Sequence, residues 1–136
     1  MAYSATITVI RIDEKNWRVK IDEIDAEATS EATILPTANS GADQVSQLPR
    51  IGTVTRQSCY RISGTGTTVR PILGTATNPS ADTIIVQVAS ASDNTDVQGQ
   101  ATYYKATSSG SFYHRSNINS GTNNVITTIY HIKEGW

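Results

Sequence analysis

Apolar and polar residues alternate one by one in two runs near the start of the chain. Residues 4–12 place Ala, Ile and Val on one side and Thr on the other, and residues 17–22 set Trp, Val and Ile against Arg, Lys and Asp. A period of two is the pattern of a half-buried strand. The polar residues 13–16 between the runs predict a turn. We therefore expect a hairpin over residues 4–24, with Trp17 in the core.

The rest of the chain continues as short strand-like runs separated by turn-forming residues. The strand candidates are 32–35, 51–62, 69–73, 83–89 and 97–104. The run 83–89 has few polar interruptions and predicts a central strand that is buried on both faces. Pro71 confines the run around it to a sheet edge or a bulge. Residues 25–35 allow either one or two helical turns or a short strand, and we favour a strand over 32–35.

These runs predict an all-β fold. They give about eight or nine short strands and no helix of about ten residues, which is typical of an antiparallel β-sandwich. Ser and Thr make up roughly a quarter of the sequence, and the strand candidates are rich in Ile, Val and Thr, which suit a half-solvated sheet. We expect a jelly-roll-like sandwich; an immunoglobulin-like arrangement is also allowed, although the Cys…Trp…Cys pattern of a true immunoglobulin domain is absent.

The length of 136 residues predicts a single domain, 1–136. Two of its segments stand out. A long loop is expected at 36–50, and loops of this length in compact domains tend to be functional. A C-terminal hairpin is expected at 111–132, followed by a tail that ends on Trp136. We expect the 36–50 loop and this tail to cross between subunits.

Charge and cysteine content narrow the choice of partners. The chain has 11 basic and 12 acidic residues, a net charge of -1, which gives no electrostatic basis for binding nucleic acid or an anionic membrane. The single cysteine, Cys59, cannot form an internal disulfide and is expected to be a small buried residue. No apolar run approaches a membrane span, and residues 1–4 lack the start of a signal peptide. We expect synthesis in a cytoplasm and a soluble product.

The sequence shows no catalytic or metal-binding motif. His114 and His131 are expected to approach each other across the terminal hairpin, as ordinary cross-strand polar residues or, alternatively, as a shared metal or pH-sensing pair. The motif of a nucleophile elbow is absent, and Gly64 and Gly66 belong to a turn rather than to a phosphate loop. We therefore expect no catalytic residue, no metal, no cofactor and no enzymatic activity.

Arginines recur through the middle of the chain at a spacing that allows them to line one side of a sheet. In a nearly neutral protein, such arginines favour contacts with an acidic protein surface over contacts with phosphate. The candidate interface residues are Arg50, Arg56, Arg61, Arg70, Tyr113 and Trp136.

Three segments resemble small β-rich virion proteins of tailed bacteriophages, especially the decoration (cement) proteins of the head. They are residues 63–74 (SGTGTTVRPILG), 110–117 (GSFYHRSN) and 127–136 (TTIYHIKEGW). The resemblance implies a structural protein on the outer capsid surface of the virion, where it binds the major capsid protein and stabilises the shell. It also implies self-association, most often as a homotrimer. The family shares no fixed site, so no residue role is carried over.

The alternative is a phage tail or fibre module, or a carbohydrate-binding sandwich that recognises a host surface. Sugar binding requires exposed aromatic side chains on one face. Aromatic residues are concentrated in the C-terminal third of the chain, at Tyr103, Tyr104, Phe112, Tyr113 and Tyr130. We expect these residues to serve core or interface packing rather than a sugar platform.

Overall fold

The protein folds into strands alone over the part of the chain that the structure describes. This structure, a computed structural model, describes residues 3–34, 48–49, 51–79, 83–87, 94–104, 112–119 and 121–135. Within these ranges there are nine strands and no helix, and the strand pairings are antiparallel. The strands are β1 (Ser4–Arg11), β2 (Asn16–Ile24), β3 (Ala32–Ile34), β4 (Ile51–Ser63), β5 (Ile72–Gly74), β6 (Ile84–Gln87), β7 (Asn94–Tyr104), β8 (Phe112–Arg115) and β9 (Val125–Glu134). The all-β prediction is confirmed.

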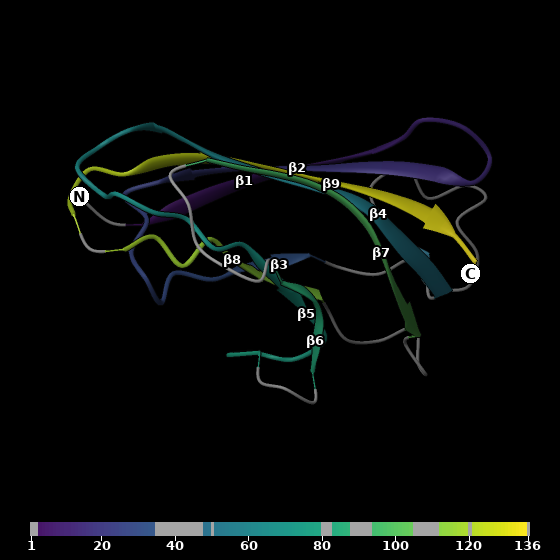
Figure 1. Cartoon of the computed structure of the whole chain (residues 1–136). Helices are drawn as coiled ribbons and strands as arrows, with labels where there is room; N and C mark the ends of the chain where they lie inside the picture. The colour runs from purple at the N-terminus through teal and green to yellow at the C-terminus, as the bar shows by residue number, and fades with distance from the viewer. Residues whose placement is uncertain are drawn as a thin grey trace.

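The strands form two sheets that lie one above the other. The larger sheet has the order β1-β2-β9-β4-β7 and the smaller one has the order β3-β8-β5-β6. Figure 1 shows the five-stranded sheet as a long, curved upper layer and the four-stranded sheet as a lower layer. Buried apolar side chains from both sheets pack against one another between the layers. The arrangement is that of a β-sandwich.

The strands from β2 to β9 are paired in a nested manner. β2 pairs with β9, β3 with β8, β4 with β7, and β5 with β6. Successive pairs therefore alternate between the five-stranded and the four-stranded sheet, and β1 extends the larger sheet beside β2. The outermost nested pair joins residues that are far apart in the sequence, which makes most of the fold non-local.

The core forms where the inward positions of the two sheets meet. Trp17, Val19 and Ile21 of β2 are fully buried, as are Phe112 of β8 and Leu73 of β5. The burial along β2 alternates residue by residue, as the period-two pattern predicts. The predicted core position of Trp17 is confirmed, and so is the hairpin over 4–24, in which β1 and β2 pair from end to end.

The predicted C-terminal hairpin at 111–132 is wrong. β8 belongs to the four-stranded sheet and β9 to the five-stranded sheet, so these neighbours in sequence do not pair. The segment between them crosses from one layer to the other; Asn117, Asn123 and Gly121 adopt positive φ angles along it. Ile118 anchors this crossing in a second apolar cluster. Turn-forming residues mark such a crossing as readily as a hairpin loop.

One further expectation is corrected. The run 83–89 was expected to form a central strand, but β6 is the last strand of the smaller sheet, and its side chains are half-buried. Of the alternatives for residues 25–35, the favoured strand is present as β3. Residues 25–31 form neither helix nor strand, and Asp25, directly after β2, takes a positive φ of 57°. The predicted loop at 36–50 lies almost entirely outside the described residues.

Candidate functional site

A cluster of polar side chains lies between the two sheets, and we call it the buried polar cluster. Its members come from the start of the chain and from four strands, β2, β4, β8 and β9. They are Tyr3, Glu23, Gln57, Cys59, His114, Thr128 and Tyr130. Apart from Tyr3, which is half-buried, all of these side chains are almost completely removed from solvent. Polar groups in such a place are stable only when they bind one another.

The hydrogen bonds of the cluster run in one direction, which is set by a backbone carbonyl. The carbonyl of Pro71 can only accept, so the group that faces it at 3.1 Å is the amide nitrogen of Gln57. The same nitrogen donates to the hydroxyl oxygen of Tyr130 at 3.4 Å. The hydroxyl of Tyr130 is then available to donate to Nδ1 of His114 at 2.7 Å. A neutral imidazole that accepts this hydrogen bond at Nδ1 carries its proton on Nε2.

The chain of donors ends on the carboxylate of Glu23. Nε2 of His114 lies 3.1 Å from Oε1 of Glu23 and donates to it. The hydroxyl of Tyr3 donates to the other oxygen, Oε2, at 2.7 Å. Both oxygens of this buried carboxylate therefore receive a donor, one from each layer of the sandwich. The arrangement fixes how β8 sits over β2, and it satisfies a charge that would otherwise be very costly to bury.

The remaining acidic groups of the cluster are held in their protonated forms. Burial raises the pKa of the Cys59 thiol to about 12, and the hydroxyl of Thr128 donates to its sulfur at 3.2 Å. Burial also raises the pKa of Tyr130 well above its ordinary value. Tyr3 is less deeply buried, and its pKa is raised as well. A thiol with so high a pKa is not a nucleophile near neutral pH. The cluster is thus arranged to hold the fold together.

The expected approach of His114 and His131 is wrong. His114 points into the buried polar cluster from β8, whereas His131 lies on the opposite, outward side of β9, beside Arg18 and Arg56. The two histidines belong to different sheets, so they are not cross-strand neighbours. Within the described ranges, no three His, Cys, Asp or Glu side chains are placed to hold a metal ion together.

The predicted interface arginines do not share one face. Arg56 lies on the outward side of β4, opposite His131, while Arg61 lies five positions further on and opposes the buried Ile126. Because side chains alternate along a strand, an odd spacing places Arg56 and Arg61 on opposite sides. Arg70 lies before β5, outside the strands, where its backbone NH donates to Ser116.

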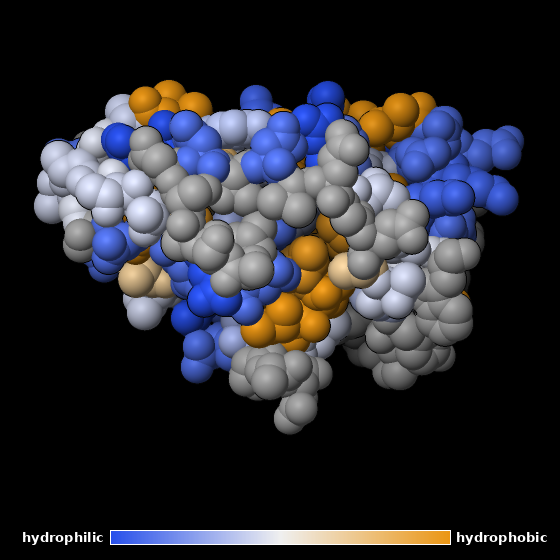
Figure 2. Space-filling view, viewed as in Figure 1, coloured by the Kyte–Doolittle hydropathy of each residue, from blue (hydrophilic) through white to orange (hydrophobic). Residues whose placement is uncertain are grey.

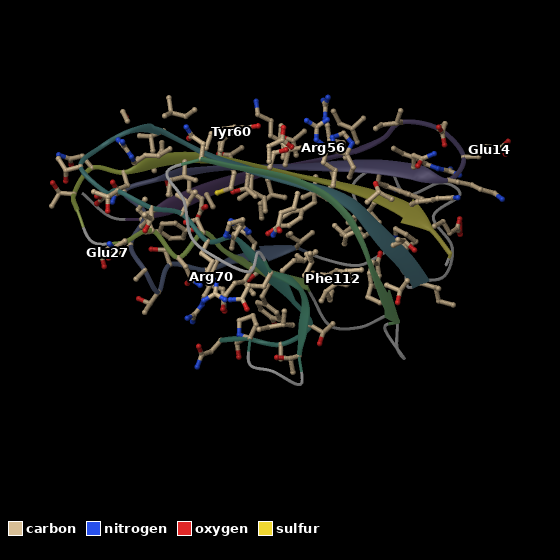
Figure 3. All side chains as sticks on the ribbon, viewed as in Figure 1. Glu14, Glu27, Arg56, Tyr60, Arg70 and Phe112 are labelled. Atoms are coloured by element: carbon tan, nitrogen blue, oxygen red, sulfur yellow. The ribbon has the colours of Figure 1, made fainter. Side chains whose placement is uncertain are left out.

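Of the other candidate interface residues, the structure describes Tyr113. Tyr113 is half-buried on β8, where it pairs with Thr33 of β3 and Gly74 of β5. Arg50 and Trp136 lie outside the described residues. Figure 3 shows Arg56 and Tyr60 rising from the five-stranded sheet, away from the smaller sheet. Of the predicted set, Arg56 is thus the residue that stands on a broad outward sheet face.

Arg56 is held in a defined geometry on that face. Its Nε and Nη2 donate to the two carboxylate oxygens of Asp96, at 2.9 and 2.7 Å. These hydrogen bonds lower the pKa of Asp96 to about 2. A bidentate pair of this kind is the strong form of an exposed ion pair, although solvent screens it.

Most of the aromatic residues of the C-terminal third lie in the core. Phe112 and Tyr130 are fully buried, and Tyr103 is 5% exposed. The rings of Tyr103 and Phe112 meet edge to face, with centroids 4.9 Å apart. The hydroxyl of Tyr103 donates to the carbonyl of Pro49. The expected use of these residues in packing is confirmed for these three.

Two hollows open at the end of the sandwich where β2 ends and β9 begins. One, of about 240 Å³, is lined by Ile24, Asp25, Ser63, Asn123 and Val125. The other, of about 260 Å³, is lined by Glu27, Ala28, Thr29 and Gly121. Among the described lining residues, each contains a single carboxylate, whereas a glycosidase site uses a pair of carboxylates.

The sequence pattern did not lead us to predict the buried polar cluster, although it places one member of the cluster, Glu23, on the inward side of its strand. Glu23 has the same strand parity as Trp17, Val19 and Ile21, so alternation alone places its carboxylate inward. Its partners could not be found in this way, because they lie on strands whose pairing the local pattern does not reveal.

Comparisons with known proteins leave the chain without an assigned family. No protein-family model matches it, and no curated protein matches it in sequence. In the described ranges there is also no helix of the length and apolarity that a membrane span requires.

Proposed function

We propose that the chain is a non-enzymatic structural protein of a virus particle, a decoration (cement) protein that binds the outer surface of a bacteriophage head. The observation that carries the proposal is the nested strand order, with β2-β9-β4-β7 in one layer and β3-β8-β5-β6 in the other. We interpret this order as that of an eight-stranded jelly roll, an architecture that occurs in viral capsid proteins and in lectins. The inference from fold to function is an analogy, and it agrees with the resemblance in sequence.

The distribution of polar chemistry supports a structural role. The buried polar cluster, which contains His114, Glu23 and Cys59, lies between the layers and is occupied by internal hydrogen bonds. The accessible feature is the outward face of the five-stranded sheet, which is broad and gently curved (Figure 1). A surface of this shape suits a large partner better than a small ligand, which binds in a concave site.

Such a protein would stabilise a shell by mass action. Each copy that binds the assembled shell and not its free subunits lowers the free energy of the assembly, and many copies add their contributions. Self-association, proposed here as a homotrimer, would link neighbouring contacts and cover the open sheet edges at β1 and β7.

The experiment adds the purified chain to emptied, expanded head shells of the phage whose genome encodes it. The expected result is saturable co-sedimentation with the shells and a higher temperature of shell disassembly. Light scattering across a dilution series checks the proposed trimer in free solution. A chain that stays in the supernatant at all concentrations would refute the proposal.

The carbohydrate-binding alternative is tested in the same preparation. Lectins share the jelly-roll architecture, but Tyr103, Phe112 and Tyr130 of the predicted platform are in the core. Of the other two members, Tyr113 is half-buried and the side chain of Tyr104 lies outside the described part of the structure. A saccharide panel that raises the melting temperature of the free chain would favour this alternative. An unchanged melting temperature, together with shell binding, would favour the decoration protein.

A further inference from the structure

Three basic side chains stand side by side on the outward face of the five-stranded sheet, and we call them the basic row. The strand register places Arg18 of β2 directly opposite His131 of β9, and His131 directly opposite Arg56 of β4. Direct cross-strand partners have Cβ atoms about 5 Å apart, so the row brings these three side chains within reach of one ligand. Ile10 of β1 continues it on one side, opposite Arg18, and is 39% exposed.

The basic row concentrates positive charge around His131. Arg18 and Arg56 flank it on the neighbouring strands, so a positive charge on the imidazole would be opposed from both sides. Arg56 has a counter-charge in Asp96. For Nε of Arg18, which is buried, no hydrogen-bond partner is present among the described residues.

The positive charges of the basic row affect the pKa of His131. Its pKa is lowered, first by burial and then by the positive charges of Arg56 and Arg18, while Asp96 opposes the change. These groups face it from β4, β2 and β7, the other strands involved. The imidazole is therefore kept neutral between two guanidinium groups until an anion arrives.

We propose that the basic row is a docking site for carboxylate side chains of a protein partner. The inference deepens the proposed function, on which it rests for the identity of the partner as a head shell; the site itself can be tested without a shell. Carboxylates fit because the guanidinium groups of Arg18 and Arg56 flank His131 on this face, and Arg56 already binds one carboxylate there.

The surroundings of the basic row favour a protein over a nucleic acid. Asp22 and Asp96 lie on the same face, two positions from Lys20 and next to Arg56, and would repel a continuous phosphate backbone. Exposed or half-exposed isoleucines adjoin the row at positions 10 and 129. Figure 2 shows the same mixture along the upper side of the molecule, where blue residues are interrupted by orange ones. Carboxylates set among apolar side chains match this pattern.

The proposal has a definite pH dependence. A bound carboxylate beside His131 favours the imidazolium form, so binding is accompanied by proton uptake. Affinity for an acidic partner therefore increases as the pH falls from about 7.5 to about 5.5, a range in which glutamate side chains remain largely ionised.

The test uses a fluorescein-labelled oligoglutamate peptide and fluorescence anisotropy, at low and at physiological salt. The wild-type chain is expected to bind, more tightly at low salt. The double variant R18S/R56S is expected to bind about tenfold more weakly, given the usual strength of exposed charge pairs. The variant H131Q is expected to lose the pH dependence.

Lys15→Ser is the matched control. Lys15 is exposed in the turn between β1 and β2, away from the row, and its recorded hydrogen bonds use only the backbone. It removes one positive charge and should change the affinity by less than about twofold. Thermal melts confirm that every variant is folded.

Three results would overturn the inference: no peptide binding by the wild-type chain, an equal loss in K15S and R18S/R56S, or preferential binding of an oligothymidylate over the peptide. Repeating the shell experiment with R18S/R56S separates the two proposals. Shell binding that survives in this variant refutes the basic row and leaves the proposed function. Peptide binding without shell binding refutes the proposed function and leaves the basic row.

Discussion

The carboxylate of Glu23 shows how much a single buried residue can depend on its partners. It lies between the two layers of the sandwich and accepts hydrogen bonds from Tyr3 and His114. We expect Glu23→Ala to lower the free energy of unfolding by about 3 kcal/mol, because the change opens a cavity and leaves two buried donors without an acceptor. Urea denaturation measures this difference. Glu27→Ala, at an exposed position, is the control and should change stability by less than about 0.5 kcal/mol. Equal stability of the two variants would contradict the description of the cluster.

Arg56 and Asp96 allow a test of the electrostatics of the outward face. Replacing Arg56 by Gln removes the first cause of the low pKa of Asp96, so this pKa should rise from about 2 toward the ordinary value of 3.8. The stabilising effect of the ionised carboxylate is present above the ordinary pKa and is lost as the pH falls toward the lower value. NMR titration of the Asp96 carboxyl carbon gives the pKa directly. Arg18→Gln serves as the control, and an Asp96 pKa that stays near 2 in R56Q would show that Arg56 is not its cause.

At the scale of the strands, the local sequence pattern predicted the strand pairing correctly only where the partner strand is next in sequence. The hairpin of β1 and β2 could be predicted because both runs alternate and the turn between them is polar. The apolar run that forms β6 was expected to be a central strand because it has few polar residues. It lies at a sheet edge, and the hydrophobicity of a run does not indicate the position of its strand in the sheet. For β8 and β9 the turn residues were recognised, but a turn within one sheet and a crossing between sheets have the same composition.

The crossing between β8 and β9 depends on one glycine. Gly121 has a φ of 85°, and a Cβ atom there would overlap the backbone of Thr65 and Gly66. We expect Gly121→Ala to destabilise the protein by more than the cost of the φ angle alone, which is about 1 kcal/mol. Gly135→Ala is a matched control, because Gly135 has nearly the same φ of 83° and open space around it. The difference between the two unfolding midpoints measures the contact, and no difference would exclude it.

At the scale of the whole molecule, the sequence predicts the class of the fold and leaves its assembly open. Strand count and alternation indicate a sandwich, but the nested order of β2 to β9 depends on pairings between distant residues. The buried polar cluster and the basic row arise from that order, since each draws on three or more strands. Arg56 could be selected as an interface candidate from its residue type, whereas its alignment with His131 and Arg18 required the register.

The most direct test of the account is an electron cryomicroscopy map of expanded head shells saturated with the chain. The expected result is ordered density for the sandwich on the outer surface of the shell. In this density, the outward face of β2, β9 and β4 is turned toward the shell, with acidic side chains opposite Arg18 and Arg56. A map of the saturated shell without this density would contradict the proposed function, and a sandwich bound with this face toward solvent would contradict the docking site.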